Sequence, residues 1–220
     1  MRGLKKPMPK IIQVNKLESE DWLQITANVL DSSGVIGFPT DTFYGLGANP
    51  FDSTAIDKIF TIKSRDKGKP ILLLIGEGGQ LTQVVKKVSK EAEILIKAFW
   101  PGPLTLLFEA ASGLPSNLLG NGNTIGVRFP NNQVVSQLMR KIGRPITGTS
   151  ANVSGSVECR SGTELLNALG DKLDLVLDGG EAPGGKASTI VDTSCFPPKL
   201  IRDGEVEREK IESVLNISLE

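Results

Sequence analysis

Short apolar runs recur along this chain and alternate with segments of helical periodicity. The runs at 35–38, 71–75 and 104–108 have the length and composition of strands buried on both faces. Apolar residues spaced three or four positions apart mark helices near 53–60 and 89–99. This alternation predicts an α/β architecture, because strands separated by helices assemble into a sheet that the helices cover.

The second half of the chain repeats this pattern and then changes it. A short turn joins the last two predicted strands, at 188–192 and 200–202, and leaves no room for a crossover helix. We therefore expect one twisted sheet of mixed parallel and antiparallel strands, flanked by helices. The other predicted elements are a helix capped by Ser19 and ended by Gly34, strands at 124–129 and 173–177, and helices at 134–142, 165–169 and 211–215.

The length and composition predict one globular domain. With 220 residues and 39% hydrophobic content, the chain can bury one substantial core. The charge and prolines of residues 1–10 predict a flexible N-terminal tail, which leaves 11–220 as the folded domain. No apolar stretch follows the basic start, and the run at 71–75 is too short to span a bilayer, so no membrane association is expected.

The composition also restricts the chemistry. The chain has no histidine, which excludes Ser-His-Asp and Cys-His catalysis and histidine-ligated metals. The 25 Lys and Arg residues balance the 25 Asp and Glu residues, so the protein has no global basic field for nucleic acid. Cys159 and Cys195 are too few for a disulfide framework and lack metal-ligand spacing, which favours a cytoplasmic location.

Two pairs of polar residues at a spacing of two suggest a ligand site. In extended chain, alternate residues point the same way, so Lys63 with Arg65, and Ser150 with Asn152, could each present two polar groups to one ligand. Lys67 and Lys69 continue the cationic series, and phosphate neutralisation explains four such cations better than helix capping does. The ligand is expected to be an anion, with a nucleotide or RNA phosphates as the alternatives.

Two further features bear on this site. Arg128 lies in an apolar strand, where it must meet a carboxylate, a ligand or solvent. The glycine-rich segment 180–187 is not a Walker A motif, because Ala187 stands where a Mg²⁺-binding hydroxyl is required and a strand follows in place of a helix. Its glycines either let a loop approach the ligand or form a turn.

In this order, the polar segments resemble those of the YrdC-like family of threonylcarbamoyl-AMP synthases, from about residue 12 to residue 202. The motifs that carry the resemblance are PTDTFYGLG (39–47), KSR with a later lysine (63–69), FWPGPLT (99–105), TIGVR (124–128), SANVSG (150–155), STIVD (188–192) and LIRDG (200–204). Each motif is weak alone, but the ordered set is specific.

The resemblance implies a fold, a reaction and a set of contacts. The implied fold is a mixed α/β domain with a large, concave, positively charged cavity. The implied reaction consumes L-threonine, bicarbonate or CO₂, and ATP with Mg²⁺, and releases pyrophosphate and L-threonylcarbamoyladenylate for N6-threonylcarbamoyladenosine in tRNA. Threonine would be bound by Thr42, Arg128, Ser150 and Ser188. ATP would be bound by Lys63, Arg65, Lys69, Thr124, Asn152, Arg160 and Arg202.

We expect a mechanism in which the amine of threonine first combines with bicarbonate or CO₂. The resulting N-carboxylate then attacks the α-phosphorus of ATP, and no protein nucleophile is needed. Lys63 and Arg65 would stabilise the developing charge, no protein metal ligand is identified, and the product would pass to the tRNA threonylcarbamoyl transferase complex. Leu74 stands where some relatives have a histidine near threonine, which favours the short, single-domain branch of the family. Two other functions stay open: an RNA-binding or regulatory module, whose basic cavity would have RNA affinity, and an adenylating enzyme with another carbamate substrate.

Overall fold

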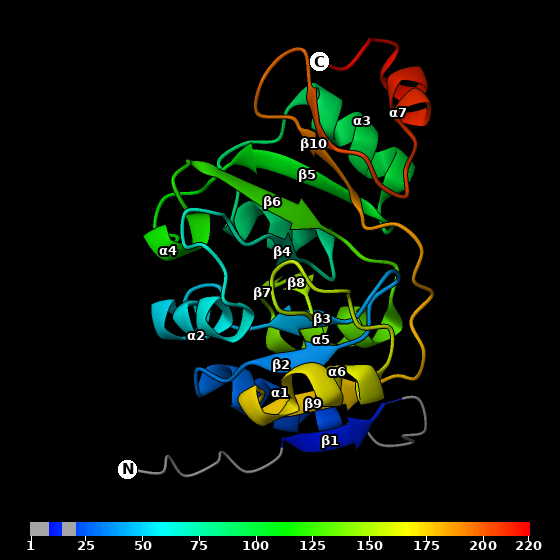
Figure 1. Cartoon of the computed structure of the whole chain (residues 1–220). Helices are drawn as coiled ribbons and strands as arrows, with labels where there is room; N and C mark the ends of the chain where they lie inside the picture. The colour runs from blue at the N-terminus through cyan, green and yellow to red at the C-terminus, as the bar shows by residue number, and fades with distance from the viewer. Residues whose placement is uncertain (1–8, 15–20) are drawn as a thin grey trace.

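The strands of the protein form two mixed sheets rather than the single sheet expected. The computed structural model describes residues 9–14 and 21–220. Within this part, sheet A has the order β1-β9-β2-β3-β8 and sheet B the order β11-β10-β5-β6-β4-β7 (Figure 1). The prediction of a mixed α/β fold is confirmed, and the division into two sheets creates a space between them.

Parallel and antiparallel pairs occur in both sheets. In sheet A, β9 runs parallel to β1 and β2, whereas β3 is antiparallel to β2 and β8. In sheet B, β5 pairs parallel with β10 and antiparallel with β6. The antiparallel β10–β11 pair confirms the prediction for the last two strands. The strands are β1 (Lys10–Gln13), β2 (Ile36–Phe38), β3 (Gly45–Gly47), β4 (Leu73–Leu74), β5 (Leu104–Glu109), β6 (Thr124–Arg128), β7 (Ile146–Thr147), β8 (Thr149–Ser150), β9 (Leu175–Asp178), β10 (Thr189–Asp192) and β11 (Lys199–Arg202).

The helices begin and end largely at the residues that the sequence indicates. Ser89 caps α3 by accepting a hydrogen bond from the Ala92 amide at 3.2 Å, and Gly143 ends α5 in the left-handed conformation at φ 67°. Ser19 lies outside the described residues. The helices are α1 (Asp21–Asp31), α2 (Ser53–Lys63), α3 (Lys90–Phe99), α4 (Ser116–Leu119), α5 (Gln133–Ile142), α6 (Gly162–Leu169) and α7 (Arg208–Leu215), with 3₁₀ turns at Gly78–Gln83 and Gly170–Lys172.

Two apolar clusters hold these elements together. Helices α1 and α5 pack on each other and on sheet A, where Leu30, Leu138 and Leu175 are buried in one cluster. The larger cluster joins sheet B to α2 and to the α3–α7 pair, and includes Leu106 and Ile211. No helix among the described residues is long and apolar enough to cross a lipid bilayer.

Some predicted elements differ from those in the structure. The run at 71–75 contributes only a two-residue strand, because the Ile71 amide bonds to the Leu118 carbonyl instead of a sheet partner. The chain at Lys10, expected in a flexible tail, begins β1, which is held beside the buried strand β9. Strands β3, β7 and β8 and helix α4 were not predicted, because each has only two to four residues.

Truncation of a fully buried side chain in sheet B should destabilise the whole domain. Leu106→Ala should lower the free energy of unfolding by about 2–5 kcal/mol, because it removes buried methyl groups and leaves a cavity. Val214→Ala, at a side chain that is 40% exposed, should change it by less than about 0.5 kcal/mol. Urea denaturation of both variants and the wild type makes the comparison, and equal losses would contradict the assigned core.

Candidate functional site

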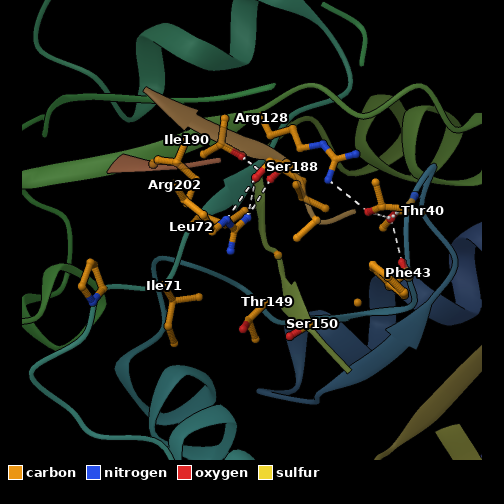
Figure 2. Close-up of a pocket in the computed structure, with 18 of the residues that line it drawn as sticks. Thr40, Phe43, Ile71, Leu72, Arg128, Thr149, Ser150, Ser188, Ile190 and Arg202 are labelled. Carbon is orange, nitrogen blue, oxygen red and sulfur yellow. Dashed lines mark hydrogen bonds between the residues drawn. The ribbon is translucent and has the colours of Figure 1, made fainter. Parts of the chain in front are cut away.

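A pocket of about 400 Å³ is lined by residues from both sheets. Its walls include the β2–β3 connection and β8 of sheet A, and β4, β5, β6, β10 and β11 of sheet B. Figure 2 shows Arg128, Ser188 and Arg202 on one side and Thr149 and Ser150 on another. We call this the main pocket. It lies where the two sheets face each other, so it depends on the tertiary structure rather than on one element.

The four residues implied for threonine binding all line this pocket. Thr42 comes from the β2–β3 connection, Arg128 from the end of β6, Ser150 from β8 and Ser188 from just before β10. They are far apart in sequence, and the fold brings them to one cavity. Their arrangement offers one cation and three hydroxyl groups, which is chemically suited to a small polar molecule with a carboxylate.

Arg128 is held in place by three protein contacts. Its side chain is 7% exposed and forms an ion pair with Asp41 at 2.5 Å. Its Nε donates to the Gly102 carbonyl at 3.1 Å, and its Nη1 lies 3.4 Å from Thr42 Oγ1. A guanidinium has five N–H donors, so these three contacts leave two for a ligand. Asp41 does not line the pocket, and its second oxygen accepts from the Asn131 amide at 3.1 Å.

A second polar group surrounds Ser188. Arg202 donates from Nε and Nη2 to the Ser188 carbonyl, and from Nη2 to Ser188 Oγ at 3.1 Å. Thr105 Oγ1 lies 2.9 Å from Ser188 Oγ and is fully buried. Burial, followed by the charge of Arg128, lowers the pKa of Arg202. Thr105 was not predicted as a site residue, although a polar residue inside the apolar run at 104–108 indicates a hydrogen-bonding role.

A second hollow, of about 360 Å³, adjoins the main pocket and is richer in polar groups. The two share Arg65, Lys69, Ser150 and Glu158, and the second also includes Asn152 and other residues of the segment after β8. We call it the cationic hollow. Most residues predicted to bind ATP therefore lie beside those predicted to bind threonine.

The extended conformation predicted for Lys63 and Arg65 is wrong. Lys63 is the last residue of α2, and Ser64 adopts the left-handed conformation at φ 49° that ends the helix. Arg65 then turns back, and its Nη2 donates to the Pro70 carbonyl at 2.9 Å. Its Nε is buried without a hydrogen-bond partner in the described part of the chain, and burial lowers its pKa. Arg65 lines both hollows, and the remaining N–H groups of its Nη1 and Nη2 atoms are available to an anion.

The four cations of this segment do not form one row. Lys69 lines both hollows, but Lys67 points away from them and pairs with Asp57 at the surface, at 2.8 Å. Lys63 lines the cationic hollow with an almost fully buried side chain that contacts three protein oxygens. Burial lowers the pKa of Lys63 to about 8. The period-two spacing wrongly predicted that the cations from Lys63 to Lys69 point the same way, because α2 ends at Lys63 and the chain turns at Ser64.

Two predicted ATP contacts lie outside both hollows. Thr124 is paired with Glu109 at the far end of β6, and Arg160 forms an ion pair with Glu181 at 2.9 Å. Among the residues that the structure describes, two carboxylates line the hollows, Glu158 in both and Asp66 in the cationic one. No group of three potential metal ligands occurs among the described residues.

The Tyr44 hydroxyl holds the start of the glycine-rich segment beside the main pocket by hydrogen bonds. Tyr44 was not predicted to have a role at the site. Its hydroxyl donates to the Gly180 carbonyl at 2.6 Å and accepts from the Gly179 amide at 3.2 Å. Asp178 lies 3.1 Å from the same hydroxyl, and burial together with this carboxylate raises the pKa of Tyr44. The Gly184 amide donates to the Thr42 carbonyl, so the segment is fastened to the pocket wall.

Comparisons with known proteins place this site in a family context. The family model Sua5/YciO/YrdC, described as telomere recombination, matches residues 28–204. Threonylcarbamoyl-AMP synthase of Pyrococcus abyssi is 36% identical over 208 residues, which are 94% of this chain and 61% of the relative. A putative threonylcarbamoyl-AMP synthase of Mycobacterium tuberculosis is 34% identical over 83% of this chain and 84% of its own length.

Solved structures agree with this fold. P. abyssi Sua5 complexed with L-threonine superposes with a TM-score of 0.90 at 36% identity, over 96% of this chain and 62% of that one. YciO of Escherichia coli gives 0.83 at 26% identity, over 93% of this chain and all of that one. This chain therefore spans about three fifths of the P. abyssi protein and the whole of YciO.

Breaking the buried ion pair of the main pocket should destabilise the fold. Asp41→Ala should lower the free energy of unfolding by about 3–5 kcal/mol, because it leaves the Arg128 charge buried without its partner. Asp57→Ala, which removes an exposed ion pair, should leave stability unchanged within error. Urea denaturation near pH 7 compares the two variants, and a neutral Asp41→Ala would contradict the tight pairing.

Proposed function

The chain belongs to the Sua5/YciO/YrdC family, and from this membership and its two adjoining hollows we propose that it is a threonylcarbamoyl-AMP synthase. The observation that carries the proposal is the convergence of Thr42, Arg128, Ser150 and Ser188 in one pocket beside a hollow lined by cations. Curated relatives with 32–36% identity bear this name, and a structural neighbour was solved with L-threonine. The substrates would be L-threonine, bicarbonate or CO₂, and ATP.

Threonine would occupy the main pocket. Its carboxylate pairs with the two free N–H groups of Arg128, and the hydroxyl groups of Ser150 and Ser188 orient it. Leu74, where some relatives have histidine, lines the pocket with an apolar wall and packs against Gly148, whose backbone approaches it too closely for any side chain. Leu74 would therefore recognise threonine by its shape rather than by a hydrogen bond.

The ATP phosphates would extend into the cationic hollow, where Arg65, Lys69 and Asn152 line the wall, with Arg202 in the main pocket. We assign no contact to Thr124 or Arg160. The cations shared by the two hollows, Arg65 and Lys69, lie at the junction where both substrates would meet. Such preorganised cations stabilise negative charge that develops during reaction.

In the proposed reaction, the amine nitrogen of threonine first forms a bond to the carbon of CO₂ and releases a proton, or reacts with bicarbonate and releases water, to give the N-carboxylate. An oxygen of this N-carboxylate then forms a bond to the α-phosphorus of ATP. The bond from that phosphorus to the bridging oxygen of the β-phosphate breaks, and pyrophosphate leaves with the electron pair. Arg65 and Lys69 would balance the charge, and the protein needs only to position the reactants. This account suits a chain without histidine.

Mg²⁺ would arrive with ATP and neutralise part of the triphosphate charge. The donor set fits this role, because Glu158 and Asp66 are too few to form a protein cage, whereas Mg²⁺ commonly takes one or two carboxylates and completes its shell with phosphates and water. The product would pass to the tRNA threonylcarbamoyl transferase complex in the cytoplasm.

Pyrophosphate release tests the proposed function. Purified protein with Mg²⁺ and ATP should release pyrophosphate only when both L-threonine and bicarbonate are present, and mass spectrometry should detect the labile acyl adenylate. Arg65→Ala and Arg128→Ala should each lower kcat/KM by at least about 100-fold, because each removes a charged contact in the transition state. Release that is independent of threonine would contradict the proposal.

A further inference from the structure

The side chain of Lys63 is directed at protein oxygens rather than at open space. Its Nζ donates to the Ser150 carbonyl, to the Asn152 carbonyl at 2.8 Å and to Asn152 Oδ1 at 2.9 Å. An ammonium has three donors, and three acceptors take them. With 2% of the residue exposed, Lys63 has neither the surface nor a free donor for a phosphate in this arrangement.

The acceptors belong to one segment, residues 150–156, which we call the SAN loop. Ser150 Oγ donates to Asn152 Oδ1 at 2.7 Å, and Asn152 Nδ2 donates to the Ser156 carbonyl at 2.5 Å. The Ser154 amide donates to the Lys63 carbonyl at 2.9 Å, which satisfies an acceptor at the end of α2. Both the backbone and the side chain of Lys63 therefore fasten the loop to the helix.

The position of the SAN loop connects the two substrate regions. Ser150 lines both the main pocket and the cationic hollow, and Asn152 lines the cationic hollow. The polar groups of Ser150 and Asn152 can contact a ligand in the hollows only while the loop keeps its conformation. Without Lys63, the Ser150 carbonyl keeps only the Asn152 amide as a donor, at 3.0 Å, and the Asn152 carbonyl loses the lysine donor that satisfies it. Leaving a buried carbonyl unsatisfied is unfavourable enough to displace the loop.

We propose that Lys63 is a positioning residue that holds the SAN loop in the shape both substrates require, rather than a direct ligand of ATP. This inference rests on the proposed function and revises the role expected for Lys63 from its motif. It distinguishes Lys63 from Arg65, which lines both hollows and has only one Nη hydrogen bonded to the described part of the protein.

The charge of Lys63 adds a pH dependence with a defined sign. Burial and the neighbouring Arg65 lower its pKa to about 8, while Glu158 and Cys159 act in the opposite direction. Below that pH the ammonium supplies three donors. Above it, the neutral amine has two donors and a lone pair that faces one of the three oxygens. The positioning effect is therefore complete below the pKa and declines as the pH rises through it.

Binding measurements on Lys63→Met test the role, because methionine fills a similar volume without hydrogen-bond donors. Isothermal titration of L-threonine alone and of ATP with Mg²⁺ alone, at pH 7, should show both dissociation constants raised by at least about tenfold. Lys67→Met removes a lysine that points away from both hollows and should change neither constant. A loss confined to ATP would mean direct phosphate contact and would overturn the proposal.

A pH series separates positioning from a general structural defect. The ratio of the threonine dissociation constants of Lys63→Met and wild type should fall toward one by pH 9.5, because the wild type then loses the charge too. The titration of threonine itself cancels in this ratio. A constant ratio would contradict the role of the charge, whereas failure of the wild type to bind either substrate would refute the proposed function instead.

If Lys63→Met does not fold, the pH dependence of ligand binding to the wild type tests the proposal. The probe is 3-hydroxybutanoate, which has the carboxylate and hydroxyl of threonine but no amine to titrate. Its affinity should fall at least about threefold between pH 7 and pH 9.5, and a flat profile over this range would overturn the proposal.

Discussion

The ion pair between Arg128 and Asp41 joins the two sheets beside the main pocket. Arg128 ends a strand of sheet B, and Asp41 lies in the connection between two strands of sheet A. Because both side chains are largely buried, each needs the other, and the relative position of the sheets is tied to the orientation of a functional cation. Asp41 stands behind Arg128, outside the pocket, so the remaining donors of the guanidinium are left for a ligand.

The same principle recurs around the site, where polar groups that would contact substrates are held by protein groups that do not. Thr105 holds Ser188, Lys63 holds Ser150 and Asn152, and Tyr44 holds the glycine-rich segment. Such support would reduce the reorganisation needed during the proposed reaction. Preorganised groups would then supply most of the rate enhancement, because the proposed reaction uses neither a protein nucleophile nor a histidine. A balanced net charge is compatible with this design, because only the cations at the junction of the hollows need to face the substrates.

Much of the fold could be predicted from the chain, and the reasons for the exceptions are physical. Helices α2, α3 and α5 carry clear apolar periodicity and caps, and β5 and β6 are short segments rich in apolar residues that are buried. Strands β7 and β8 have two residues each and exist only because partners lie beside them. The spacing of Lys63 and Arg65 suggested shared direction, but the left-handed Ser64 turns the chain between them and gives the two cations different environments.

The sequence by itself determined the α/β class, the family, the absence of histidine chemistry and most of the polar residues predicted at the site, because local periodicity and ordered motifs are written along the chain. Only the tertiary structure decided that the strands form two sheets and that Arg128 meets Asp41. It also decided that Lys67 lies apart from Lys69, and that the Lys63 ammonium donates its hydrogen bonds to the SAN loop. These outcomes depend on which distant segments share one buried space, and burial decides whether a charge must pair with protein or remains available to a ligand.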